Sequence, residues 1–141
     1  MEKPQIVERK GDRIIWRLQA ESARQEETVM HMIQPLLELF AENGEVVPVR
    51  ADEAWFDPVQ RNIRFAGKVE VLYQQWKLET ASLQYESGRD VMLVPGEFKL
   101  NGEQVRMRGG TMEVERLSQR LYVKKHVWVE DARSNGLGSL W

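Results

Sequence analysis

Between Val47 and Glu130 the sequence repeats its apolar pattern every 29 residues. The clearest repeated set is Val47, Val49 and Ala51, then Trp76, Leu78 and Thr80, then Val105, Met107 and Gly109. An earlier copy begins at Trp16, which precedes Val47 by 31 residues. Repeats of this length are typical of stacked supersecondary units, each of which buries its apolar face against its neighbours. The period therefore favours a layered, elongated fold.

Within a repeat, apolar and charged residues alternate. In the segment 63–71, IRFAGKVEV, the odd positions are apolar or glycine and the even positions are mostly charged. This is the period of a strand with one buried and one solvated face. Short polar links such as Asn101-Gly102 are typical of hairpins. We therefore predict an all-β protein with antiparallel strands.

The apolar parity flips at one register in three copies: between Ala51 and Ala54, between Thr80 and Leu83, and between Gly109 and Met112. An inserted residue, in a β-bulge or a sharp bend, would produce such a flip. A short helical turn is the alternative interpretation. Bends at one level in successive strands would curl the sheet. The predicted fold class is an open, twisted antiparallel β-jelly-roll built from repeated strand pairs.

One domain is the natural size for 141 residues. We predict an N-terminal segment over 1–10, the β-jelly-roll domain over 11–130 and a flexible C-terminal tail over 131–141, which ends in Leu140 and Trp141. The polar run from Arg24 to Thr28 predicts a turn before a strand that returns through Gln34-Pro35.

The composition excludes several classes of protein. A net charge of −2 gives no basic face for nucleic acid. No apolar run approaches the roughly 20 residues of a membrane helix, and no signal peptide is recognisable. We expect the chain as given to be soluble, with any native anchor outside it. Zero cysteines exclude disulfides and thiolate chemistry.

The sequence shows no pattern that indicates catalysis, a metal or a cofactor. His31 and His126 lie in predicted strands without further ligands at metal-binding spacing. Carboxylate pairs, such as Asp52 with Glu53 or Glu113 with Glu115, fall on solvated faces. We therefore expect a protein that is not an enzyme.

One alternative from another class is open. Trp55 and Trp128 have the outward parity of their strands. Beside a carboxylate pair they would form a platform for a glycan-binding or glycan-cleaving protein.

Several motifs in order resemble those of a known family. Gly11 to Ala20, GDRIIWRLQA, is similar to its opening motif, and Gln34 to Phe40, QPLLELF, is similar to its Q-P-x-L-x-x-F. Further matches are 49–54, VRADEA; 67–71, GKVEV; 80–83, TASL; 94–96, VPG; and 105–109, VRMRG. Together they resemble the LptC family, the periplasmic, inner-membrane-anchored part of the lipopolysaccharide export machine.

The resemblance implies a groove for lipid A acyl chains and no catalysis. Its expected lining is the inward set Val49, Phe56, Ile63, Phe65, Val69, Val71, Trp76, Leu78, Tyr85, Val94, Phe98, Leu100 and Met107, with the motif glycines Gly67 and Gly96. The implied partners are lipopolysaccharide, the inner-membrane transporter subunits and LptA, which would dock on an edge strand. The implied location is the periplasm, with an inner-membrane anchor in the full-length protein. A soluble LptA-like bridge protein is the alternative within the same superfamily.

Overall fold

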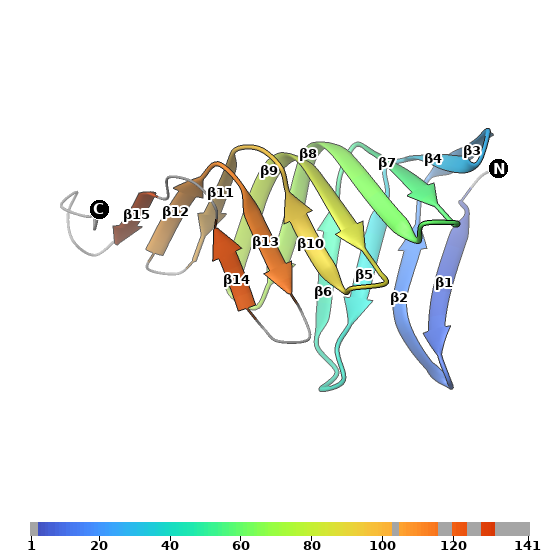
Figure 1. Ribbon diagram of the computed structural model, residues 1–141, viewed down its shortest axis with the longest axis horizontal. Helices are drawn as coiled ribbons and strands as arrows, with labels where there is room; N and C mark the ends of the chain where they lie inside the picture. Colours follow the sequence, from blue (N-terminus) through green and yellow to red (C-terminus); the bar gives the residue numbers. More distant parts are fainter. Residues whose placement is uncertain (1–2, 103–104, 116–119, 124–127, 132–141) are drawn as a thin grey trace.

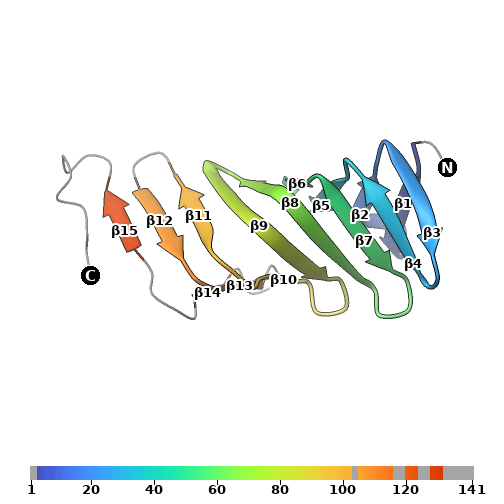
Figure 2. The same cartoon turned by 90° about the horizontal axis from the view of Figure 1, so that it is seen from above.

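The computed structural model describes residues 3–102, 105–115, 120–123 and 128–131, and it is an elongated antiparallel β structure (Figure 1). The strands run across the long axis and follow one another along it, with the N-terminal strands at one end and β15 at the other (Figure 2). The described strands are β1 (Gln5–Lys10), β2 (Arg13–Gln19), β3 (Ser22–Glu26), β4 (Val29–Ile33), β5 (Leu36–Phe40), β6 (Val46–Arg50), β7 (Glu53–Asp57), β8 (Asn62–Tyr73), β9 (Trp76–Glu86), β10 (Val91–Val94), β11 (Phe98–Asn101), β12 (Val105–Gly109), β13 (Met112–Glu115), β14 (Arg120–Val123) and β15 (Trp128–Asp131).

The sheet folds back on itself into two layers. Layer A consists of β1, β2, β5, β6, the second part of β8, the first part of β9, β11, β12 and β15. Layer B consists of β3, β4, β7, the first part of β8, the second part of β9, β10, β13 and β14. Strands β8 and β9 run through both layers and join them. This open, unclosed arrangement confirms the predicted all-β jelly-roll with repeated strand pairs.

We call the line along which the layers meet the corner. Backbone hydrogen bonds continue the pairing through it: the Gln34 amide donates to the Asp52 carbonyl at 2.9 Å, and the Asp52 amide donates to the Gly67 carbonyl at 2.8 Å. Thr80, the one buried polar residue among those described, donates its hydroxyl to the Glu97 carbonyl at 2.8 Å. The corner therefore leaves few backbone groups unpaired, as a buried bend requires.

The predicted change of register is present at the corner. Strand β6 ends at Arg50 and β7 starts at Glu53, and β12 and β13 are separated in the same way after Gly109. In β8 the pairing with β9 shifts between Ala66 and Val69. Two residues there face one on β9, which is the count of a β-bulge. The helical-turn alternative is wrong at these positions, because they lie in strands and bends.

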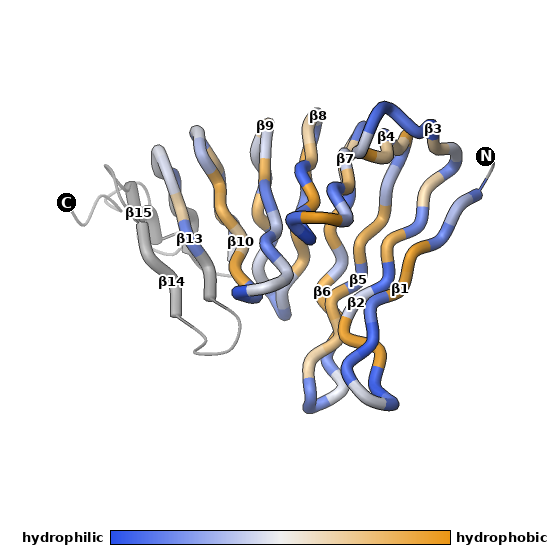
Figure 3. Tube along the Cα trace, turned by 45° about the vertical axis from the view of Figure 1, so that its right-hand side comes forward, coloured by the Kyte–Doolittle hydropathy of each residue, from blue (hydrophilic) through white to orange (hydrophobic). Residues whose placement is uncertain are grey.

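The core lies between the layers. Hydrophobic and hydrophilic segments alternate along the strands (Figure 3), and the apolar side chains of both layers form one cluster that reaches from Trp16 in β2 to Met112 in β13. Phe65 of layer B and Val49 of layer A are both fully buried in it. Burial of this kind is the main favourable term in folding.

Two polar segments form strands that the sequence pattern does not predict. The run Arg24 to Thr28 is not a turn as a whole, because β3 extends to Glu26 and pairs with β4 from Ser22↔Ile33 to Glu26↔Val29. The segment 1–10, predicted to precede the β-jelly-roll domain, contains β1, and β1 pairs with β2 along its length. Both strands lie at a sheet edge, where one neighbour is enough for pairing and fewer apolar side chains are buried.

We predict that Gly67→Ala destabilises the fold by about 1–3 kcal/mol, the usual cost of a strained backbone conformation. Gly67 has φ +84°, and an added Cβ would lie 2.6 Å from a carboxylate oxygen of Asp52. Urea denaturation measures the loss.

The matched control is Gly96→Ala. A Cβ at Gly96 would meet nothing within 4 Å, so this variant should change the free energy of unfolding by no more than about 0.5 kcal/mol. Equal losses for the two variants would contradict the role given to Gly67 in the bulge.

Candidate functional site

The predicted groove residues lie together on the inward faces of the two layers. Layer A contributes Val49, Val69, Val71, Trp76, Leu78, Phe98 and Leu100, and layer B contributes Phe56, Ile63, Phe65, Tyr85 and Val94. The position of Met107 is described only for its backbone, opposite Leu100 in β11. These residues form one surface because side chains alternate along each strand and the same alternate positions face inward in successive strands.

In this conformation the surface is closed. Nine of these side chains are at most 5% exposed: Val49, Ile63, Phe65, Val69, Val71, Leu78, Tyr85, Val94 and Phe98. Phe56, Trp76 and Leu100 are half-buried and lie nearer the margins. The two layers pack directly on each other. A ligand can therefore enter between them only when the layers separate.

The N-terminal strands extend the apolar surface beyond the predicted list. Additional buried members include Trp16, Leu18, Met32, Leu37 and Leu39. Trp16 and Leu18 belong to the early copy of the repeat, whose inward parity the sequence predicts, and the alternation of Leu37 with Leu39 is the signal that could have added these two. The candidate site thus covers all units from β2 to β13.

The motif glycines have different settings. Gly67 sits in the bulge of β8 in a left-handed conformation, whereas Gly96 is exposed at the corner between β10 and β11. Gly67 is therefore required by the backbone, and Gly96 has space around it for a larger residue or a ligand.

The side of the interior opposite the corner contains polar groups near the N-terminal end. Glu8 of β1 pairs in register with Trp16, so both side chains lie on the inward face of layer A. Two buried atoms there, Glu8 Oε2 and Trp16 Nε1, have no hydrogen-bond partner among the described residues. Each such atom costs about 1–3 kcal/mol.

Contacts between the layers occur at the same place. The guanidinium of Arg61, in the turn between β7 and β8, forms an ion pair with Glu8 Oε1. The Trp16 and Phe56 rings meet edge to face, with centroids 5.9 Å apart. These contacts link β1 and β2 of layer A to the end of β7 in layer B.

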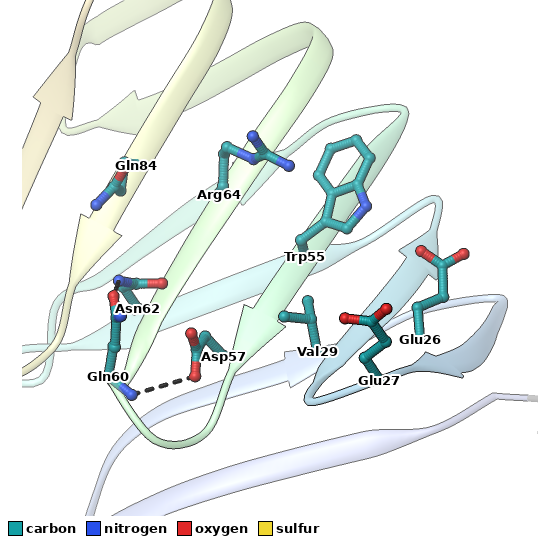
Figure 4. A pocket seen from close by; sticks show the side chains of 9 residues that line it. All are labelled: Glu26, Glu27, Val29, Trp55, Asp57, Gln60, Asn62, Arg64 and Gln84. Carbon is teal, nitrogen blue, oxygen red and sulfur yellow. Dashed lines mark hydrogen bonds between the residues drawn. The ribbon is translucent and has the colours of Figure 1, made fainter.

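The outer face of layer B has a cleft of about 560 Å³ (Figure 4). Trp55 of β7 lines this cleft, and side chains of the two neighbouring strands, β4 and β8, flank it. The His31 ring of β4 stacks on the indole at 4.8 Å, and the guanidinium of Arg64 in β8 lies 4.6 Å from the ring centre. Both neighbours occupy ring surface that a sugar would need, so Trp55 does not offer the free platform of the glycan-binding alternative. Trp128 has no described side chain.

On the outer face of layer B, the His31 ring lies near two carboxylates. His31 Nε2 lies 3.2 Å from Glu53 Oε1, and its Nδ1 lies 3.5 Å from Glu26 Oε2. On layer A, the hydrogen bond and charge of Glu70, with the charge of Glu79, raise the pKa of Lys77. The described part of the chain contains no group of three or more potential metal ligands. His126 and Glu115 have no described side chains.

Comparisons with known proteins identify a family for the sequence and a solved structure with a similar fold. The family model described as lipopolysaccharide-assembly, LptC-related, matches residues 7–130. The chain is also similar in structure to LptH, the LptA-homologous periplasmic component of the lipopolysaccharide transport device from Pseudomonas aeruginosa, with a TM-score of 0.63 and 11% identity over 79% of this chain and 82% of that one. No curated protein sequence is significantly similar to the chain. At this identity the structural likeness shows the fold alone.

We predict that Phe65→Ala lowers the free energy of unfolding by about 3–5 kcal/mol, as for other buried aromatic side chains. Phe65 is fully buried between the layers, so its removal leaves a cavity. Urea denaturation measures the change.

Arg64→Ala is the matched control on the same strand, because Arg64 is exposed on the outer face. Its contact with Trp55 is worth about 0.5–1 kcal/mol. A loss at Phe65 no larger than at Arg64 would contradict a tightly packed interior.

Proposed function

Because the chain belongs to the LptC family of lipopolysaccharide-assembly proteins, we propose that it is a non-enzymatic bridge protein. In this role it accepts lipopolysaccharide from the inner-membrane transporter and passes it to the next periplasmic bridge component, of the LptA type. The match to the LptC family model supports a role in lipopolysaccharide transport, and the fold agrees with that role. The direction and the individual partners of the transfer are part of the proposal.

The observation that carries the proposal is the continuous apolar interior. It extends from β2 to β13, and Thr80 is the one polar residue among the buried ones described. Acyl chains need a long dry surface, and each buried methylene contributes about 0.8 kcal/mol. Contact with part of an acyl chain would therefore retain the lipid, and separation of the layers would release it.

The two ends of the molecule suit docking of neighbouring proteins. Among the described strands, β1 and β3 each have one partner at the N-terminal end, and β14 and β15 each have one partner at the other. Unpaired strand edges bind further strands through main-chain hydrogen bonds. We propose that one end receives lipid from the transporter and that an edge at the other binds an LptA-type protein.

The proposed location is the periplasm, with an inner-membrane anchor in the full-length protein. The family supports the periplasmic location. The described residues contain no helix that is long and apolar enough to cross a bilayer.

We predict that a photo-reactive residue at Phe65, Phe98 or Leu78 captures lipopolysaccharide, because these positions face the interior of both layers. The product is detected as a band shift that lipopolysaccharide antibodies recognise. Glu70 is the matched outward position, on the same strand as Phe65. Labelling at Glu70 alone would contradict lipid binding between the layers.

We also predict that Gly96→Arg weakens binding of lipopolysaccharide or of the bridge partner and leaves the β-type circular dichroism spectrum unchanged. The site is exposed and open, so the fold accommodates the larger side chain. Gly88→Arg is the control, since a Cβ there also meets nothing within 4 Å. Unchanged binding in Gly96→Arg would contradict a role of Gly96 in binding.

A further inference from the structure

The ion pair between Glu8 and Arg61 has an unusual position. It connects the layers on the side opposite the corner, from β1 in layer A to the turn between β7 and β8 in layer B. Other ion pairs in the described part of the chain, such as Arg17 with Glu38 and Lys77 with Glu70, join residues within one layer. Separation of the layers at the N-terminal end must therefore break the contact between Glu8 and Arg61.

The turn holds the backbone of Arg61 firmly. Asp57 Oδ1 accepts hydrogen bonds from the amides of Val59 and Gln60. The Arg61 carbonyl accepts two bonds from Ser87, one from its amide at 3.0 Å and one from its hydroxyl at 2.8 Å. The guanidinium is thus presented from an anchored turn, while its side chain is 53% exposed and accessible to a ligand.

The inward partner, Glu8, does not use all of its hydrogen-bonding capacity. The Glu8 side chain is 15% exposed, and only its Oε1 contacts Arg61. Its Oε2 and the neighbouring Trp16 Nε1 are buried without partners among the described residues. Trp16 itself is 2% exposed. A donor and an acceptor thus lie unused just inside the contact, where a polar group of an entering ligand would meet them.

We propose that Glu8 and Arg61 form a latch at the N-terminal end, and that a phosphate of an acylated ligand opens it by replacing Glu8 on Arg61. This inference rests on the proposed function and specifies where lipid enters. A guanidinium binds phosphate through two parallel hydrogen bonds, as it binds a carboxylate. The exchange keeps Arg61 paired and frees β1 and β2 to move away from β7. The acyl chains then reach Trp16, Phe56 and the core behind them, and Trp16 Nε1 gains a possible acceptor.

The first experiment measures opening without lipid. The chain has no cysteine, so a single cysteine at Leu18, which is fully buried, reports access to the N-terminal interior through its rate of maleimide labelling. A second reporter at Val94, 1% exposed in β10, monitors the interior farther along the molecule. Glu8→Gln removes the charge and keeps the size of the side chain. Glu42→Gln is the control, because its ion pair with Arg13 lies within layer A.

We expect Glu8→Gln to accelerate labelling at position 18 several-fold and to leave position 94 protected, while Glu42→Gln changes neither rate. Acceleration at both positions would indicate global destabilisation and overturn the latch. Unchanged labelling at position 18 would overturn it as well.

The second experiment tests whether Arg61 binds the phosphate of the lipid or only holds the two layers together. Binding of lipopolysaccharide, before and after enzymatic removal of its phosphates, is compared for the unmodified chain, Glu8→Gln and Arg61→Gln. Glu8→Gln should bind phosphorylated lipid more tightly, because Arg61 has lost its competitor. Arg61→Gln should lose the preference for phosphorylated lipid.

Equal responses of the two variants would overturn the inference and leave the proposed function intact, since both would still bind lipid. Failure of all three proteins to bind either lipid would overturn the proposed function together with the latch.

Discussion

The corner on which both layers meet is the constraint on which the rest of the structure depends. A flat sheet of these strands would leave one apolar face in water, and bending every strand pair at the same level places the two apolar halves against each other. The bend is stable because its polar groups are paired, through the hydrogen bonds of Gln34, Asp52 and Thr80. Gly67 supplies the left-handed conformation that a side chain would strain.

Much of this architecture can be predicted from the sequence because it is local and repeated. The period of 29 residues identifies the strand pairs, and the parity flips identify the level of the corner. The inward residues are also predictable, since alternation assigns a face to each. Strands β1 and β3 are not predictable in the same way, because polar segments such as Ser22–Glu26 are ordered by pairing with a neighbour and not by their own pattern.

The closed state of the candidate site is also beyond sequence patterns. Parity shows that Val49 and Phe65 face inward, but the distance between the layers depends on how all side chains pack. The contact of Glu8 with Arg61 joins residues that lie far apart in the sequence. The charged side chain of Glu8 faces inward, where the repeat pattern predicts apolar residues. The same holds for Trp55, whose outward parity is readable but whose coverage by His31 and Arg64 depends on three adjacent strands.

The repeating design makes the span of the molecule adjustable in discrete steps. Each unit of 29 residues contributes two adjacent strands to each layer. In one unit, β6 and the second part of β8 are neighbours in layer A, and β7 and the first part of β8 are neighbours in layer B. Gain or loss of one unit would lengthen or shorten the molecule by roughly 10 Å, twice the spacing between neighbouring strands. The corner, the dry interior and both terminal edges would keep their form. Evolution could thus fit such a protein to compartments of different width by duplication or deletion alone.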